Sequence, residues 1–358
     1  MRSGSSKAER KIGWKIARAD PTLASVRYRI DAPIRMLKAR GHDASRVEGG
    51  AIEAFDTIVF CKSYGADDQA LAARARREGK TVVFDLCDNH FYNPHSLPRY
   101  EKARHDLLAM MAIADIVTCT THALSEVIQS ETGHKVIPRL VEDLPESMPL
   151  TQVRNPAEPL TLLWYGSHGS PNAPSGLADL ATLGPHLEAL AATTPLQLLV
   201  CSNSAEKYEA LIRPMALKTS YFDWSERRQA SLIQRSDAVL IPVTINPFTD
   251  CKSNNRLTMA LGAGLPVLAT AIQSYREFAP FCRLDDWAEG LSALVEDYET
   301  EKLRAMAGRE YLAQHWTEDR IAVQWERALE IAGNPRQRYR MEIERELSCR
   351  GYLDPCSG

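Results

Sequence analysis

Short apolar runs alternate with longer amphipathic stretches along the whole chain. In the first half, the apolar runs cover residues 11–18, 57–61, 81–86 and 115–119. Runs of this length that are rich in β-branched residues predict strands. Because strands that alternate with helices are typical of βα units, we predict an α/β fold built on parallel sheets.

The stretches between these runs carry apolar residues every three or four positions, which is the spacing of one helical face. Two helices are predicted in this way, over residues 24–40 and 67–78. Each is followed directly by a glycine, Gly41 and Gly79. Glycine readily adopts the left-handed conformation that closes a helix, so both ends are well marked.

The pattern breaks near the middle of the chain. Residues 144–159 contain four prolines and little periodicity, as expected of a linker. The alternation then resumes and predicts five more strands, at residues 160–165, 196–201, 221–223, 238–242 and 266–270. We therefore expect two doubly wound domains, over residues 1–150 and 151–331, and a tail of residues 332–358 that adds one more helix.

Two domains of this class are expected to face each other across a cleft. In doubly wound sheets, ligands bind outside the carboxyl ends of the strands. The residues that directly follow each predicted strand are therefore the first candidates for chemistry, and in this chain those positions are mostly polar.

Composition and charge narrow the classes of function. The chain has 358 residues, of which 44% are hydrophobic and 25% charged, so it is a folded globular protein and not a disordered one. A formal net charge of -3 provides no overall basic field for nucleic acid. No apolar run approaches the roughly 18 residues of a membrane span, and no signal-peptide core follows the N-terminus. We expect a cytoplasmic protein that at most visits the inner face of the membrane.

The cysteines point to the same compartment. The chain has eight of them and no CxxC pair, which disfavours a zinc site, and a chain of this length needs no disulfides. We expect reduced thiols that are buried as small hydrophobic side chains. No metal site is predicted.

The strongest candidate site is a cationic helix start. The segment 236–278 predicts a buried strand, a loop, a helix from about residue 253 to 263 and a further strand. Lys252 and Arg256 lie four residues apart at the start of this helix, where unpaired N–H groups and the helix dipole already favour anions. Further hydrogen-bond donors lie between them, namely Ser253, Asn254 and Asn255. This pattern predicts a phosphate or diphosphate site; the alternative is a solvated basic helix face.

A second candidate follows the strand at residues 160–165. The turn begins with Gly166, Ser167, His168 and Gly169. A glycine-rich turn between strand and helix lets backbone amides approach a phosphate, and His168 adds a donor that strengthens when protonated. The alternative is a plain tight turn.

The segment 236–278, which contains the cationic helix start, carries a family resemblance. The string KSNNRLTMALGAGLPVLAT, preceded by SDAVLIPV and followed by SYREF, resembles the donor-binding domain of GT-B glycosyltransferases, in particular the retaining glycosyltransferase family 4, or glycosyl transferases group 1. WTEDRIAVQWERALEI is similar to the final helix that crosses back to the N-terminal domain in that fold. ASVRYRIDAPIRMLKARGH and VVFDLCDNHFYNP resemble its opening helix and its fourth strand. The resemblance thus extends over nearly the whole chain.

The resemblance implies a glycosyltransferase of the hexosyltransferase type that moves a sugar from a nucleotide-diphosphate sugar, with UDP or GDP as the nucleotide, to an acceptor hydroxyl. Retention, independence of metals and other cofactors, and a place in bacterial polysaccharide or glycoconjugate synthesis follow from it as expectations. The donor is expected to bind in the C-terminal domain and the acceptor toward the N-terminal domain. The acceptor would be a glycan, a lipid-linked sugar, a protein or a small molecule. Lys252 and Arg256 would stabilise the charge that builds up on the leaving diphosphate.

The resemblance also implies roles for further residues of the C-terminal domain. In similar enzymes the loop after its third strand lies beside the nucleobase, which makes Phe222 and Trp224 candidates for base contacts. Glu277 matches an acidic residue near the donor. Core packing and a helix cap are the respective alternatives.

In the N-terminal domain the loop after residues 81–86 matches the position of a His-Asp pair in relatives. Asp88 matches the aspartate, Cys87 occupies the histidine position, and His90 lies close enough to compensate. Asp88 and His90 are therefore candidates to bind sugar hydroxyls or to accept the proton of the acceptor. A basic trio near the first helix is a candidate for an anionic acceptor or for the diphosphate, namely Arg27, Arg29 and Arg35.

Departures from the family pattern keep other functions open. The two acidic positions of the family fall at Cys251 and Met259, neither of which accepts hydrogen bonds as a carboxylate does, although Asp250 is adjacent. A nucleotide-sugar hydrolase or epimerase on the same fold, or a catalytically silent binding or scaffold protein, are the alternatives. A nicotinamide dehydrogenase is disfavoured because no GxGxxG follows the first strand.

Overall fold

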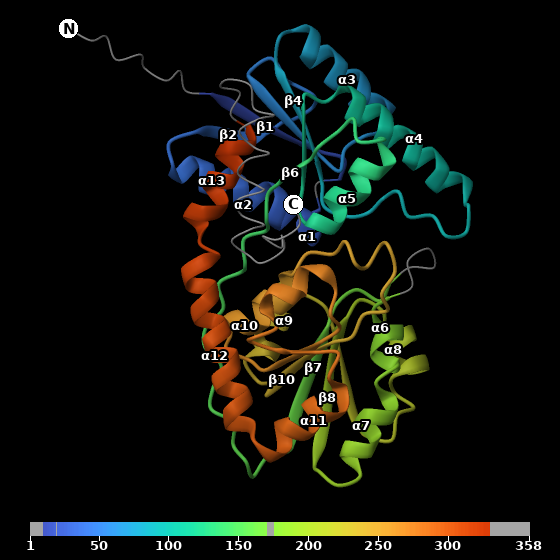
Figure 1. Cartoon of the computed structure of the whole chain (residues 1–358), viewed down its shortest axis with the longest axis vertical. Coiled ribbons are helices and arrows are strands. Elements are labelled where there is room, and N and C mark those ends of the chain that lie inside the picture. Colours follow the sequence, from blue (N-terminus) through green and yellow to red (C-terminus); the bar gives the residue numbers. More distant parts are fainter. Residues whose placement is uncertain (1–9, 19, 170–174, 330–358) are drawn as a thin grey trace, which may run out of the picture.

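The computed structural model describes residues 10–18, 20–169 and 175–329. These residues form two α/β units, one above the other in Figure 1, and each unit contains a six-stranded parallel sheet. The strand order is β2-β1-β3-β4-β5-β6 in the first sheet and β12-β11-β10-β7-β8-β9 in the second. Helices flank both sheets. The predicted class, two doubly wound α/β domains, is confirmed.

The first unit holds the N-terminal sheet. Its strands are β1 (Lys11–Ile16), β2 (Asp43–Arg46), β3 (Thr57–Cys61), β4 (Thr81–Leu86), β5 (Ile116–Cys119) and β6 (Arg139–Leu140). Its helices are α1 (Ala24–Val26), the π-helical turn η1 (Arg27–Asp31), α2 (Ala32–Ala39), α3 (Ala66–Arg77), α4 (Pro98–Ile113) and α5 (His122–Glu131). The first three run on without a break, so the helix predicted over residues 24–40 is present with a wider turn inside it.

The second unit follows the linker. Its strands are β7 (Leu160–Tyr165), β8 (Leu196–Ser202), β9 (Lys218–Asp223), β10 (Ala238–Ile241), β11 (Val267–Ala269) and β12 (Arg283–Leu284). Its helices are α6 (Leu177–Ala181), α7 (Gly184–Ala191), α8 (Ala205–Leu211), α9 (Glu226–Ile233), α10 (Asn255–Gly262), the 3₁₀ turn η2 (Gln273–Phe278), α11 (Trp287–Glu296) and α12 (Tyr298–His315). The last described helix is α13 (Glu318–Leu329).

Every strand predicted from an apolar run is present, whereas β2, β6 and β12 were missed. All three lie at the edge of a sheet, and all three contain at least one arginine and are partly exposed. An edge strand pairs on one side only and need not be apolar. The hydrophobic pattern therefore carried no signal for these strands.

The carboxyl edges of the two sheets face each other. The side-chain amide of Asn89, which follows β4, donates to the carbonyl of Pro247 at 2.8 Å, and the Thr121 hydroxyl donates to the carbonyl of Cys251 at 3.0 Å. The strand order reverses between β7 and β10 in one sheet and between β1 and β3 in the other. These reversals are the places where doubly wound folds bind ligands, and both open onto the contact between the units.

The connection between the units is held along its length. Residues 144–159 contain no helix or strand, as predicted, and Figure 1 shows this segment passing beside α12. Arg309 of α12 donates to the carbonyl of Met148 at 3.0 Å, and Lys302 donates to the Thr151 hydroxyl at 2.7 Å. These bonds bind the linker to the second unit.

The last described helix returns to the first unit. Helix α13 packs against α2, and Trp325 is fully buried with its ring edge-on to Trp14 of β1, at 5.8 Å between centroids. This helix, as far as Leu329, lies within the segment expected to cross back to the first unit. The helix predicted in residues 332–358 lies outside the described residues.

All six cysteines of the described residues are unpaired, and only Cys87 among them is partly exposed. None of the helices in the described part of the chain combines the length and apolar character that crossing a bilayer requires.

We expect the return of α13 to stabilise the first unit strongly. Trp325→Ala removes a fully buried indole that packs on Trp14 and on the Arg29 guanidinium, 4.8 Å from its ring. Large-to-small changes of this kind lower the free energy of unfolding by about 3–5 kcal/mol. Urea unfolding measures the change. Arg327→Ala, on the exposed face of the same helix, is the control and should shift stability by less than about 0.5 kcal/mol; equal effects would refute this packing.

Candidate functional site

An ion triad joins the two units where their sheets meet. The ammonium nitrogen of Lys252, just before α10, lies 2.6 Å from one carboxylate oxygen of Asp88. The ammonium nitrogen of Lys62, just after β3, lies 2.6 Å from the other oxygen. Burial alone would raise the pKa of Asp88, but Lys252 and Lys62 outweigh it and hold this pKa well below its usual range. Asp88 is thus an anion between one cation from each unit.

Lys62 was not among the predicted site residues. Its backbone has φ +49°, a left-handed conformation that residues other than glycine seldom adopt, and its N–H donates to the carbonyl of Asp85 at 2.9 Å. Burial lowers its pKa, but Asp88 more than compensates, so Lys62 stays charged at neutral pH. Its place directly after a predicted strand was the signal that could have identified it.

His90 lies beside the triad as a neutral side chain. Its Nδ1 atom is 2.9 Å from the Tyr64 hydroxyl. Burial, together with the positive charges of Lys62 and Lys252, lowers the pKa of His90 to about 4, against a smaller opposite effect of Asp88. At neutral pH the ring can therefore exchange hydrogen bonds with a ligand but carries no charge.

The second predicted cation, Arg256, lies in the first turn of α10 and faces the turn after β7. A Cβ atom on Gly166 would lie 3.2 Å from a guanidinium nitrogen of Arg256. The Tyr165 hydroxyl donates to the carbonyl of Arg256 at 2.6 Å. The structure thus brings Gly166 and Arg256 together at the strand-order reversal between β7 and β10.

The rest of the glycine-rich turn is tied to the next strand. The backbone N–H and the Nδ1 atom of His168 both lie 2.9 Å from the side-chain oxygen of Asn203, which follows β8. Lys207 donates to the carbonyl of His168 at 3.3 Å. Ser167 lies between Gly166 and His168. Asn203 and Lys207 are additions to the predicted set.

The three polar residues between the cations have different surroundings. The side-chain nitrogen of Asn255 donates to the carboxylate of Asp143, in the first unit, at 2.9 Å. The side-chain oxygen of Asn255 is buried with no hydrogen-bond partner among the described residues. Asn254 is buried, and with Ser253 it lines a small cavity between the two units. Asn255 therefore serves the contact between the units in this structure.

That cavity measures about 50 Å³ and also contains Glu277, whose carboxylate accepts a hydrogen bond from Tyr311 at 2.7 Å. Sites for small molecules usually enclose about 300–1,000 Å³. A nucleotide sugar therefore does not fit within this cavity as it stands.

The predicted base-contact residues lie at the end of β9, where Trp224 meets Arg27 of the first unit. Trp224 donates its indole N–H to Gln229 at 2.5 Å, and the guanidinium of Arg27 lies 5.4 Å from its ring centroid. Phe222 packs on the core of the second unit and remains partly exposed.

The basic trio of the first helix is not a common anion site. Arg29 is 1% exposed and paired with Asp85 at 2.5 Å, so the expectation that it meets a ligand is wrong. Arg35 of α2 pairs with Glu318 of α13 at 2.5 Å. Only Arg27 remains beside the contact between the units.

The two residues at the acidic positions of the family pattern, Cys251 and Met259, are both buried. Met259 is buried, with its sulfur 2.8 Å from the Gln229 amide nitrogen. Cys251 is buried against the core of the first unit. The adjacent Asp250 accepts a hydrogen bond from the backbone N–H of Gln273 at 2.9 Å.

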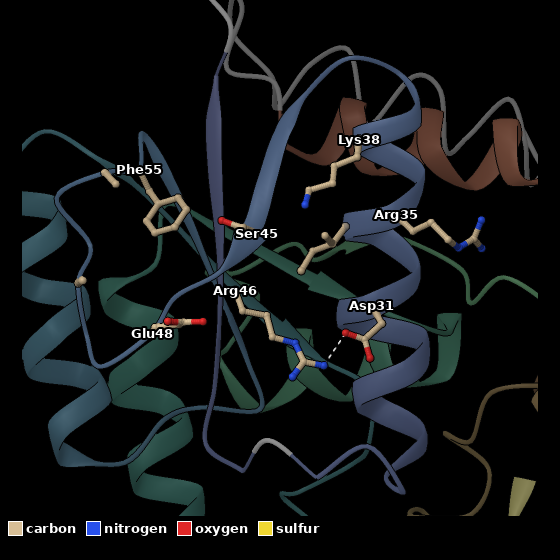
Figure 2. Close-up of a pocket in the computed structure, with 10 residues that line it drawn as sticks. Asp31, Arg35, Lys38, Ser45, Arg46, Glu48 and Phe55 are labelled. Atoms are coloured by element: carbon tan, nitrogen blue, oxygen red, sulfur yellow. Dashed lines mark hydrogen bonds and ion pairs between the residues drawn. The ribbon is translucent and has the colours of Figure 1, made fainter.

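A wider hollow lies elsewhere, in the first unit. Figure 2 shows this groove of about 810 Å³ between β2 and α2, with Lys38, Arg46 and Phe55 along it. Arg46 is paired with Asp31 at 2.5 Å. Of the candidate residues named from the sequence, only Arg35 lines it. Within the described ranges, no three His, Cys, Asp or Glu side chains are grouped as metal ligands.

Comparison with known proteins identifies the fold. The sequence matches no protein-family model and no curated protein. Among solved structures, sucrose-phosphate synthase from Thermosynechococcus elongatus aligns with a TM-score of 0.67 at 14% identity, over 94% of this chain and 100% of the other. HepE from Anabaena, in complex with UDP and glucose, aligns with a TM-score of 0.63 at 11% identity, over 89% and 99%.

A third match is longer than this chain. TarM aligns with a TM-score of 0.59 at 12% identity over 77% of this chain, which spans only 55% of TarM. Together with the two facing Rossmann-like sheets, these matches show that the chain has the GT-B fold of glycosyltransferases.

The environment of His90 predicts an unusual titration. We expect its imidazole to titrate near pH 4 in NMR spectra, with His90→Gln used to assign its signal. In the unfolded chain the group takes up a proton near pH 6.5, so protonation favours unfolding as the pH falls from about 6.5 to 4. The free energy of unfolding should therefore decline over this window, and less so in His90→Gln. Titration of the native ring near pH 6.5 would contradict the described surroundings.

Proposed function

We propose that the protein is a glycosyltransferase that moves a sugar from a nucleotide-diphosphate sugar to an acceptor hydroxyl. The observation that carries this proposal is the pair Lys252 and Arg256 at the start of α10, beside the strand-order reversal of the second sheet and facing the first unit. A helix N-terminus with two added cations suits a diphosphate. The GT-B fold supports the same reaction class.

The chemistry gives these cations a role. As the bond between the anomeric carbon and the phosphate oxygen breaks, negative charge builds up on the leaving diphosphate and positive charge on the sugar ring. Lys252 and Arg256 would stabilise the transition state more than the ground state, because the charge they face is larger there. The acceptor oxygen forms the new bond, and its proton passes to the leaving phosphate. This front-side course retains the anomeric configuration and needs no metal.

The rest of the site would position the donor. The turn at Gly166, Ser167 and His168, which faces Arg256 through Gly166, would lie beside the phosphates, and Phe222 and Trp224 suit the nucleobase of UDP or GDP. Ser253, Asn254 and Glu277, which line the small cavity between the units, would lie beside the sugar.

The acceptor side belongs to the first unit. Asp88 and His90 lie across from Lys252 and would contact the hydroxyls of donor sugar and acceptor. A role in bacterial polysaccharide or glycoconjugate synthesis, in the cytoplasm or at the inner face of the membrane, fits a donor of this class.

A catalytically silent binding protein is the second candidate. The observation that favours it is the replacement of both family carboxylates by buried side chains, Cys251 and Met259. Such a protein would bind the nucleotide and release no sugar. Release of free nucleotide in the presence of an acceptor extract would exclude it, and release without any acceptor would indicate a hydrolase or epimerase.

The first test measures donor binding by thermal shift with UDP, GDP, CMP, dTDP and ADP sugars. A ligand at 100 times its dissociation constant adds about 2.7 kcal/mol of stability. We expect one nucleotide class to stabilise the wild type and to lose this effect in the double variant Lys252→Ala, Arg256→Ala.

The matched control removes two exposed arginines from the same unit, Arg213→Ala and Arg235→Ala. It should respond to the nucleotide as the wild type does. Absence of stabilisation by every nucleotide in the wild type, or equal stabilisation of all three proteins, would remove the proposed donor site.

A further inference from the structure

We propose that Lys62 is a positioning residue for the donor: it stays paired with Asp88 and so frees Lys252 to exchange that carboxylate for the donor's diphosphate. The inference rests on the proposed function, since it deepens the role of the same site. It concerns a residue of the N-terminal unit that would not touch the donor itself.

The two lysines share Asp88 symmetrically but are held differently. Both ammonium nitrogens lie 2.6 Å from a carboxylate oxygen. The Lys62 side chain is 24% exposed and Lys252 is 38% exposed, with its ammonium group 4.1 Å from the Phe248 ring centroid. Lys252 is therefore the more accessible of the two cations, and it belongs to the unit expected to bind the donor.

The backbone of Lys62 fixes its position. It follows β3 at the strand-order reversal of the first sheet, in the left-handed conformation described above. Strained residues of this kind persist where the surrounding structure holds them, and they gather at functional sites. Lys62 and Asp88 both belong to the first unit, so their pair survives when the units separate.

An exchange without Lys62 would be unfavourable. If Lys252 left, Asp88 would remain as a carboxylate only 19% exposed with no ion-pair partner, which costs free energy. Its charge would also repel the incoming diphosphate. With Lys62 in place, the carboxylate stays compensated and Lys252 can turn to the phosphates.

This exchange predicts that the effects of substitutions at Lys62 and Asp88 on nucleotide affinity are not additive. Isothermal titration calorimetry with UDP and with GDP, which lack the sugar, measures affinity for the diphosphate part alone. Lys62→Met should weaken the binding of the nucleotide that stabilises the wild type by about tenfold or more, because Lys252 then remains on Asp88. Lys62→Arg keeps the charge and should stay within about threefold of the wild type.

The same substitution should matter little once Asp88 is neutral. In an Asp88→Asn background there is no carboxylate to compensate, so Lys62→Met should change affinity by less than about threefold. Asp88→Asn alone should bind the nucleotide at least as tightly as the wild type, and this result does not depend on the folding of Lys62→Met. The control is Lys11→Met, which removes a lysine paired with Asp43 at 3.7 Å on the same unit and should leave affinity unchanged.

The outcomes separate this inference from the proposed function. Equal weakening by Lys62→Met in both backgrounds would mean that Lys62 binds phosphate directly or acts through folding, and it would overturn the inference. The inference would also be overturned if Lys62→Met, made in the wild type, left the nucleotide affinity unchanged. A tenfold loss of affinity in Asp88→Asn alone would overturn it as well. If the wild type binds neither nucleotide nor any of the nucleotide sugars, the proposed function fails and this inference fails with it.

Discussion

One buried guanidinium holds together the parts from which the site is built. Arg29 is almost fully buried, donates to both oxygens of Asp85 at 2.5 and 3.0 Å, and reaches the carbonyl of Val141 at 2.6 Å and Asp143 at 3.1 Å. A charge taken out of water is costly unless partners satisfy it, and here two carboxylates do so. Arg29 thereby fastens η1 and the end of β4 to residues 141–143, directly before the linker.

The influence of this cation extends to the second unit. The Asp143 carboxylate that accepts from Arg29 also accepts from Asn255, the first residue of α10. The helix start that carries Lys252 and Arg256 is therefore anchored to the first unit on one side, while the Lys252–Asp88 pair makes a second link. All the hydrogen bonds of the Arg29 guanidinium lie within the first unit, so separation of the units would break the Asn255 and Lys252 contacts and leave these bonds in place.

The hydrophobic pattern was sufficient for the fold because buried parallel strands are nearly continuous apolar runs. All strands except β2, β6 and β12 follow from it, whereas the crossing helix with Trp325 was expected from the family resemblance. Ligands of doubly wound folds bind outside the carboxyl ends of the strands, so the residues that follow predicted strands are candidates. This rule leads to Gly166 and Asp88, and it also points to Lys62, which follows a predicted strand directly. Edge strands such as β2 were not predicted, because their side chains are partly exposed and form no apolar run.

The sequence by itself determined the layer architecture, the linker and the cationic start of α10, because these depend on local periodicity and on neighbours within a few residues. Only the tertiary structure decided which charges meet. Arg29 and Arg27 are two residues apart, yet one is buried on Asp85 and the other lies over Trp224, and Lys252 pairs with a carboxylate 164 residues away. Electrostatic partners depend on distances in space, which no spacing along the chain specifies.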